Sequence, residues 1–175
     1  KGECCGTPGE TGYFTGECTR TLSSAVRSGA AVLDAAGVDR CVEAMAKDLD
    51  GCGWVGPSSP AVPAACEGII AGQTGERALC RSSLECSEGL TCQGLTATRT
   101  GKCFPPKRSG IVCDGSTDTL AALTRQNQVA VTHPECGGYC NRPVCTDTIA
   151  LGAACKIDDE CGLHRTCLGG KCSET

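Results

Sequence analysis

The sequence predicts a small disulfide-rich fold, with short α-helices in the N-terminal part and two short-stranded cysteine fingers. The chain has 175 residues, of which 18 are cysteine, and such a cysteine content is typical of a disulfide scaffold. Eight of these cysteines form two copies of one spacing pattern. Only five residues are aromatic and 24 are glycine, so a small core has to offset a large ordering entropy. Several bridges are therefore expected to hold the fold.

The cysteine count also indicates the compartment. Disulfides persist in oxidising environments and are rare in the cytosol, so we expect an extracellular or cell-surface protein, with a metal-rich cytosolic protein as the alternative. The chain begins at Lys1, which we interpret as the start of a mature product after removal of a signal peptide; a trimmed longer chain, or one that has lost a lipid anchor, would look the same. The 18 cysteines would form nine bridges if all are paired: Cys4, Cys5, Cys18, Cys41, Cys52, Cys66, Cys80, Cys86, Cys92, Cys103, Cys113, Cys136, Cys140, Cys145, Cys155, Cys161, Cys167 and Cys172.

Charge and motifs argue against several classes of function. The net charge is −4 and there is no basic run, so the electrostatic signature of nucleic-acid binding is missing. No apolar stretch approaches the roughly 20 residues that span a bilayer. The sequence has no Gly-x-Ser-x-Gly, His-Glu-x-x-His or Walker motif, and His133 and His164 are its only histidines. We therefore expect no enzymatic activity and no cofactor.

The N-terminal part is expected to be helical and stapled. Apolar residues recur at three- and four-residue spacing over residues 34–52, which predicts an amphipathic helix that Gly51 ends. Cys41 would lie on the buried face of this helix, with Cys66 or Cys52 as its partner. Residues 22–33 fit either a second helix, which we favour, or a short strand followed by a turn.

The rest of the chain alternates fingers with a connector. Each finger is expected to hold two very short strands, because the loops between its cysteines are too brief for helices. Ser116 is a good N-cap for a helix of about three turns in the connector, and Cys136 to Cys145 would form a tight three-cysteine knot. The predicted organisation is a helical region at 1–75, a first finger at 76–104, a connector at 105–145 and a second finger at 146–175.

The two fingers share their layout. The first is Cys80-x5-Cys86-x5-Cys92-x10-Cys103, the second is Cys155-x5-Cys161-x5-Cys167-x4-Cys172, and both close with Gly-Lys-Cys. The pattern Gly-x2-Cys-x4-Glu-Cys-x5-Cys, which the second copy fits best, resembles the cysteine-rich modules of Dickkopf and colipase-like proteins. Four cysteines allow three pairings. The resemblance implies first with third and second with fourth: Cys80–Cys92, Cys86–Cys103, Cys155–Cys167 and Cys161–Cys172.

The wider layout resembles a family of secreted or surface cysteine-rich proteins from myxobacteria and related bacteria. The matching features are Asp39-Arg-Cys41 in the helical part, Cys136-Gly-Gly-Tyr-Cys140 and the two fingers, so the resemblance covers about residues 30–172. It implies an architecture and carries over no catalytic residues, because that family has no established activity and fold alone does not define a binding face.

Two clusters have the residue types of metal sites. His133, Cys136, Cys140 and Cys145 offer one imidazole and three thiolates, a set that zinc accepts, but we favour bridged cysteines and a loop histidine. The run Asp158-Asp159-Glu160, and more weakly Asp48 with Asp50, could offer oxygens to calcium, but we favour solvated acidic turns.

The sequence thus predicts a non-enzymatic, secreted, disulfide-stapled protein whose partners are proteins, including copies of itself. We favour a structural or adhesive subunit of an extracellular or cell-surface assembly. The alternative is a soluble binding module, such as a secreted protease inhibitor or a receptor ligand, for which Arg99, Lys107-Arg108 and Arg142-Pro143 are the exposed basic points expected.

Overall fold

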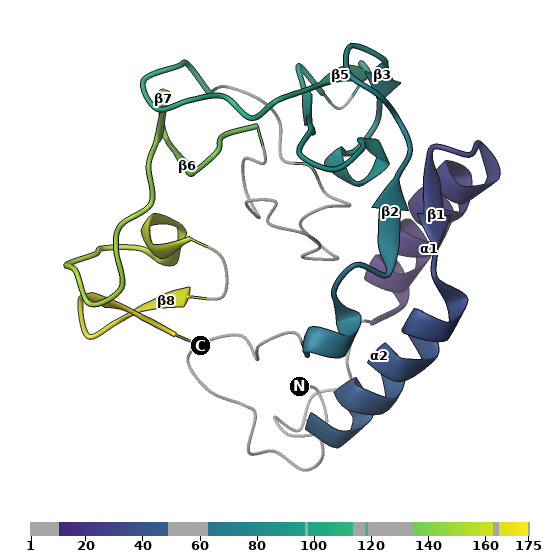
Figure 1. Cartoon of the computed structure of the whole chain (residues 1–175), viewed down its shortest axis with the longest axis horizontal. Helices are drawn as coiled ribbons and strands as arrows, with labels where there is room; N and C mark the ends of the chain where they lie inside the picture. The colour runs from purple at the N-terminus through teal and green to yellow at the C-terminus, as the bar shows by residue number, and fades with distance from the viewer. Residues whose placement is uncertain are drawn as a thin grey trace.

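The computed structural model is a small disulfide-rich structure with two α-helices and several short antiparallel strand pairs (Figure 1). It describes residues 11–48, 63–96, 98–113, 118, 135–162 and 165–174. All 14 cysteines with a described side chain take part in seven disulfides. In the described part of the chain, no helix is long and apolar enough to cross a membrane.

Helix α1 (Thr11–Arg27) ends in a left-handed glycine cap. The N–H of Ala30 donates to the carbonyl of Ala25, and the N–H of Gly29 donates to that of Val26, with Gly29 at φ 74°. These two bonds define a Schellman motif, in which a glycine takes the positive φ that ends a helix. The motif reverses the chain and releases Ala31 into a strand.

Strands β1 (Ala31–Leu33) and β2 (Ile70–Gly72) form an antiparallel pair beside α1. The preferred prediction of a helix over residues 22–33 is therefore right for its first half, which ends α1, and wrong for Ala31–Leu33. The reason is tertiary: β2 supplies a partner for each of these residues. Leu84, from further along the chain, completes the buried apolar cluster here, which comprises Ala25, Ala31, Ile70 and Leu84.

Helix α2 (Ala35–Asp48) confirms the helix expected over residues 34–52, as far as the structure describes them, but Val42, which the apolar spacing places on the inner face, is 60% exposed. The carbonyl of Asp34 accepts its first helical hydrogen bond, from the N–H of Val38. Cys41 is bonded to Cys66, one of the two partners expected for it, in the 3-10 helix η1 (Ala64–Cys66). This bridge fixes η1 against α2.

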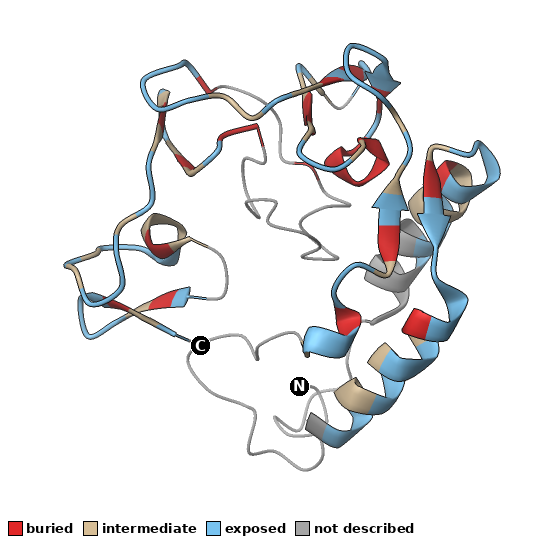
Figure 2. Cartoon of the chain, in the orientation of Figure 1, coloured by how far each residue is buried: buried red, intermediate tan, exposed pale blue. Residues whose placement is uncertain are grey.

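The first bridged segment, residues 74–104, has a three-stranded sheet in the order β3-β5-β4. Two disulfides, Cys80–Cys92 and Cys86–Cys103, make its core, and buried residues gather there in Figure 2. A 3-10 helix, which the sequence did not predict, fits between two cysteines because one such turn needs only three residues. The elements are β3 (Leu79–Cys80), η2 (Ser83–Glu85), β4 (Thr91–Gln93) and β5 (Gly101–Phe104).

The bridged hairpin consists of β6 (Tyr139–Asn141) and β7 (Val144–Thr146), with residues 107–113 alongside. Val112 pairs antiparallel with Val144, so β7 lies between β6 and residues 110–113. Cys113–Cys140 and Cys136–Cys145 close this unit. A half-buried ion pair of 2.7 Å between Lys107 Nζ and Glu135 Oε2 joins its two parts.

The second bridged segment, residues 149–174, has one two-stranded sheet and the bridges Cys155–Cys167 and Cys161–Cys172. Its elements are η3 (Asp158–Cys161), β8 (Arg165–Leu168) and β9 (Lys171–Glu174). Several expectations lie outside the described residues: the connector helix after Ser116, the stop at Gly51, both histidines, Asp50, and the bridges of Cys4, Cys5 and Cys52.

Candidate functional site

The proposed zinc ligands are occupied by one another and by a fourth cysteine. Cys136 is bonded to Cys145, and Cys140 is bonded to Cys113, while His133 lies outside the described residues. Sulfurs of Cys113, Cys136 and Cys140 lie within 4.8 Å of one another, but this closeness follows from two neighbouring bridges. Zinc binds thiolates, which these sulfurs are not in the bridged state. The structure thus has the bridged arrangement that we favoured.

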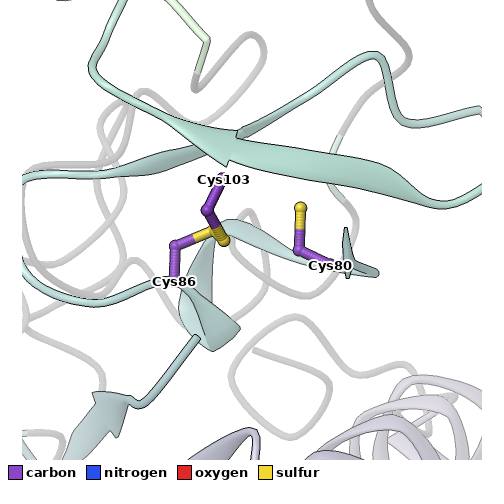
Figure 3. A group of neighbouring side chains, drawn as sticks. All are labelled: Cys80, Cys86 and Cys103. Atoms are coloured by element: carbon purple, nitrogen blue, oxygen red, sulfur yellow. A yellow bond between two sulfur atoms is a disulfide. The ribbon is translucent and has the colours of Figure 1, made fainter. Parts of the chain in front are cut away.

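The same holds for the cysteines of the first bridged segment. Cys80, Cys86 and Cys103 also converge within 4.8 Å, and Figure 3 shows the bond between the sulfurs of Cys86 and Cys103 with Cys80 beside it. Cys80 itself is bonded to Cys92. These convergent sulfurs form an apolar core rather than an open ligand set.

The acidic run of the second bridged segment serves the backbone. The carboxylate of Asp158 accepts from the Thr166 hydroxyl at 2.8 Å and from the N–H of Cys167 at 2.7 Å. The carboxylate of Glu160 accepts from the N–H of Lys156. Carboxylates that accept such bonds hold the 3-10 turn in place, which gives these residues a structural role that the calcium hypothesis overlooked.

Positions 75 residues apart make the same hydrogen bonds. Glu85 Oε2 accepts from the N–H of Arg81 at 2.7 Å, as Glu160 does from Lys156. Likewise, the Ser83 hydroxyl accepts from the N–H of Cys92 at 3.0 Å, where Asp158 accepts from Cys167. The two segments therefore share backbone caps as well as cysteine spacing.

The turn before each sheet makes the same backbone hydrogen bond in both segments, but the donor is Arg77 in the first and Gly152 in the second. Arg77 donates its N–H to the carbonyl of Cys103, and Gly152 donates to that of Cys172. Arg77 has φ 68° and Gly152 has φ 80°. A left-handed conformation costs about 1–2 kcal/mol for a residue with a Cβ, so the first segment carries strain at a position where the second has glycine.

The segments differ at the start of their 3-10 helices. In the first, Asp118 is 2% exposed, and its carboxylate accepts from the Ser82 hydroxyl at 2.9 Å and from the N–H of Ser83. In the second, the equivalent N-cap is Ile157, which makes no side-chain cap and is 52% exposed. Asp118 thus ties the connector to the first segment.

Each segment turns a row of three cross-strand neighbours toward solvent. In the first, Lys102 pairs with Leu79 on one side and Gln93 on the other. In the second, Lys171 pairs with Ala154 and Leu168 in the corresponding places. Both lysines are exposed, and the leucines are 65% and 60% exposed respectively. In both rows an exposed leucine is thus the cross-strand neighbour of the lysine. The leucine belongs to the strand before the 3-10 helix in the first segment and to the strand after it in the second.

Among the basic points expected to be exposed for an inhibitor, Lys107 is instead half-buried and paired with Glu135, and the others lie in turns. The carbonyl of Arg108 accepts from the N–H of Ile111, and Gly110 has φ 84°. Arg99 exchanges backbone hydrogen bonds with Thr96 across a tight hairpin. Arg142 starts the two-residue turn between β6 and β7. Proteases bind extended strands through unpaired backbone groups, so these conformations do not favour a substrate-like inhibitor loop.

Tyr139 is a buried tyrosine of the bridged hairpin whose hydroxyl is influenced by Glu160 of the second bridged segment. It is 7% exposed, and burial raises the pKa of its hydroxyl above the ordinary value of 10.0, with a further contribution from the negative charge of Glu160. Both causes disfavour the phenolate, so Tyr139 stays neutral in the folded protein at physiological pH.

Two features of these surfaces escaped sequence reasoning. The Asp118 anchor joins residues 35 and 36 positions apart, and no local pattern signals such a contact. The Gly-x2-Cys motif already included Gly152, but it did not show that Arg77 makes the same left-handed turn. Comparisons with protein-family models, with characterised proteins and with solved structures gave no match.

Proposed function

We propose that this chain is a non-enzymatic, secreted structural subunit that associates through the outer faces of its bridged segments. The single observation that carries the proposal is the exposed leucine beside a lysine on each bridge-locked sheet, Leu79 beside Lys102 and Leu168 beside Lys171. A backbone that disulfides already hold loses little further entropy when a partner covers it. Such faces suit durable association outside the cell, and the abundance of disulfides is consistent with secretion.

We further propose that residues 76–104 and 146–175 are two copies of one cysteine finger. Support comes from the pairing of first with third and second with fourth cysteine in each segment, which is the pairing that the resemblance to Dickkopf and colipase-like modules implies. The shared glutamate cap and the shared turn add to it. In this proposal the chain presents one scaffold twice with different surface residues.

The experiment combines location with association state. The full chain would be collected from the culture medium of a secreting host, and its mass would be measured unreduced after denaturation with an alkylating agent. We expect a mass lower than that of the reduced chain by two hydrogens per bridge, with no alkylation. Sedimentation velocity over a wide concentration range would then show reversible association. A chain that carries alkylated cysteines, or that stays monomeric throughout, contradicts the proposal.

A soluble binding module is the second candidate. The observation in its favour is that the leucine lies on opposite sides of the lysine in the two rows, so that the two segments present different surfaces. A monomer whose sedimentation is independent of concentration, but which binds a different secreted protein, would support this candidate over the assembling subunit.

A further inference from the structure

Charge is unevenly distributed along the chain. Residues 1–75 contain five basic and nine acidic residues, a net charge of −4, whereas residues 76–145 contain eight basic and six acidic residues, a net charge of +2. Residues 146–175 contain three basic and five acidic residues. Oppositely charged surfaces on one chain attract each other between copies, which steers association and fixes its orientation.

In the acidic part of the chain, residues 1–75, an exposed apolar residue of α2 lies between two carboxylates. We call the outward side of α2 formed by Asp39, Val42 and Glu43 the acidic helix face. Helical spacing puts these residues side by side, all three are exposed, and Val42 is 60% exposed. Nearby Arg40 is engaged by Asp34 at 3.2 Å, and Lys47 lies one turn beyond Glu43. The face therefore offers a branched aliphatic side chain flanked by two carboxylates.

The basic middle of the chain offers the complementary chemistry. We call the row Leu79, Lys102 and Gln93 the leucine–lysine face. Leu79 is the most exposed large apolar residue described, at 65%, and Lys102 is its direct cross-strand neighbour. The Arg77 side chain, 80% exposed, lies two residues before Leu79 and contacts Glu76 only loosely, at 3.8 Å. Strain at Arg77 is retained where glycine would relieve it, at the border of this face.

We propose that the acidic helix face of one copy docks on the leucine–lysine face of a second copy. Val42 would pack on Leu79, while Glu43 and Asp39 would meet Lys102 and Arg77. The two faces belong to different elements of the chain, α2 and the β3–β5 pair (Figure 1), so each copy keeps one face free after the first contact. Such heterologous contacts build chains or rings rather than isolated dimers. This inference rests on the proposed function, since it names the partner of the assembling subunit.

The second bridged segment provides a matched control. Lys156 is exposed like Lys102, but it lies outside both leucine-bearing rows and in a part of the chain with a net charge of −2. A Lys156→Glu change should therefore leave self-association unchanged, whereas Lys102→Glu should weaken it.

Charge reversal and mixing test the proposal. Sedimentation velocity at low and physiological salt would compare the full wild-type chain with Glu43→Lys, Lys102→Glu and Lys156→Glu. We expect the first two variants to raise the dissociation constant of self-association at least about tenfold, since like charges then meet. An equimolar mixture of these two variants should associate again, because each supplies the face that the other has lost. Wild-type association should also weaken as salt rises.

The outcomes separate the two claims. An unreduced mass and circular dichroism equal to those of wild type establish that the variants fold. The docking of these two faces is overturned if neither reversal weakens wild-type association, if Lys156→Glu weakens it as much as Lys102→Glu, or if mixing does not restore it. Each of these outcomes leaves the structural-subunit proposal standing. A wild-type chain that stays monomeric at every concentration overturns the proposed function itself, and the docking with it.

Discussion

A single buried carboxylate, that of Asp118, holds the connector to the first bridged segment. Removing it by Asp118→Ala leaves the Ser82 hydroxyl and the N–H of Ser83 without this acceptor in a buried site, which should cost about 2–3 kcal/mol of unfolding free energy. Urea unfolding with all disulfides intact measures the change. The exposed Asp147→Ala is the control and should change stability by less than about 0.5 kcal/mol; equal effects would refute the anchor.

The turn at Gly152 and Arg77 allows a test of backbone strain in both directions. A Cβ added at Gly152 meets nothing within 4 Å, so Gly152→Ala should lose about 1–2 kcal/mol through its positive φ alone. Arg77→Gly should gain about 0.5 kcal/mol, since relief of strain outweighs the added freedom of the unfolded chain. Gly75→Ala, which has open space and no positive φ, should lose nothing. Thermal unfolding with intact disulfides would rank the three variants.

Ionisation of Tyr139 should lower the stability of the folded protein at alkaline pH. Because burial raises its folded-state pKa above that of the unfolded chain, the folded protein holds its proton more tightly. The stabilising contribution is full below pH 10 and is lost as the pH rises through the folded-state pKa. We expect the unfolding free energy to fall above about pH 10 in wild type and to fall less in Tyr139→Phe. Urea unfolding of both proteins, measured in neutral and in alkaline buffer with only brief exposure to the latter, would show whether the two pH curves differ.

At the scale of the element, the 3-10 helices depend on glutamate caps. Glu85 is 6% exposed and Glu160 is half-buried, so loss of the carboxylate should cost more in the first bridged segment. Glu85→Ala should destabilise by about 1–3 kcal/mol and Glu160→Ala by about 1 kcal/mol. Hydrogen exchange at the N–H groups of Arg81 and Lys156 would report each cap directly, and unchanged exchange would count against a capping role.

The elements differ in how far the sequence predicts them. Helix α2 can be predicted from the spacing of its apolar residues, because one face of the helix packs on η1 and the other is exposed to water. Strand β1 does not, because its backbone is paired by β2 from 39 positions along the chain. The end of α1 was not predicted, because the helix favoured over residues 22–33 ran through Gly29, although glycine at the position after a helix is a stop. Short 3-10 turns between cysteines leave no periodic pattern to detect.

At the scale of the whole molecule, the described bridges form four closed rings that follow one another in sequence. The rings span residues 41–66, 80–103, 113–145 and 155–172, and none of the seven described bridges joins two of them. Bridge closure stabilises mainly the loop that it encloses. The second bridged segment is thus expected to behave as a separate unit of stability, whereas the first shares a buried cluster with Ala25, Ala31 and Ile70 through Leu84.

This arrangement predicts local rather than global damage when a ring is opened. Replacing Cys155, Cys161, Cys167 and Cys172 by serine should remove hydrogen-exchange protection throughout the second bridged segment. Protection at Cys92 and Cys103 in the first segment should stay within about threefold of the wild-type rates, because no described bridge connects the segments. Loss of protection in both segments would show that they unfold as one unit.

The order of the rings along the chain also determines how the chain would respond to a pulling force. A ring passes tension through its sulfur–sulfur bonds, so most of the residues inside it cannot be drawn out while those bonds last. Between the rings, residues 67–79, 104–112 and 146–154 lie outside every described bridge that would limit their extension. The part of the chain from Cys41 to Cys172, pulled at its two ends, would therefore lengthen by short, fixed steps and then resist, as a tether made of stiff links joined by brief extensible threads.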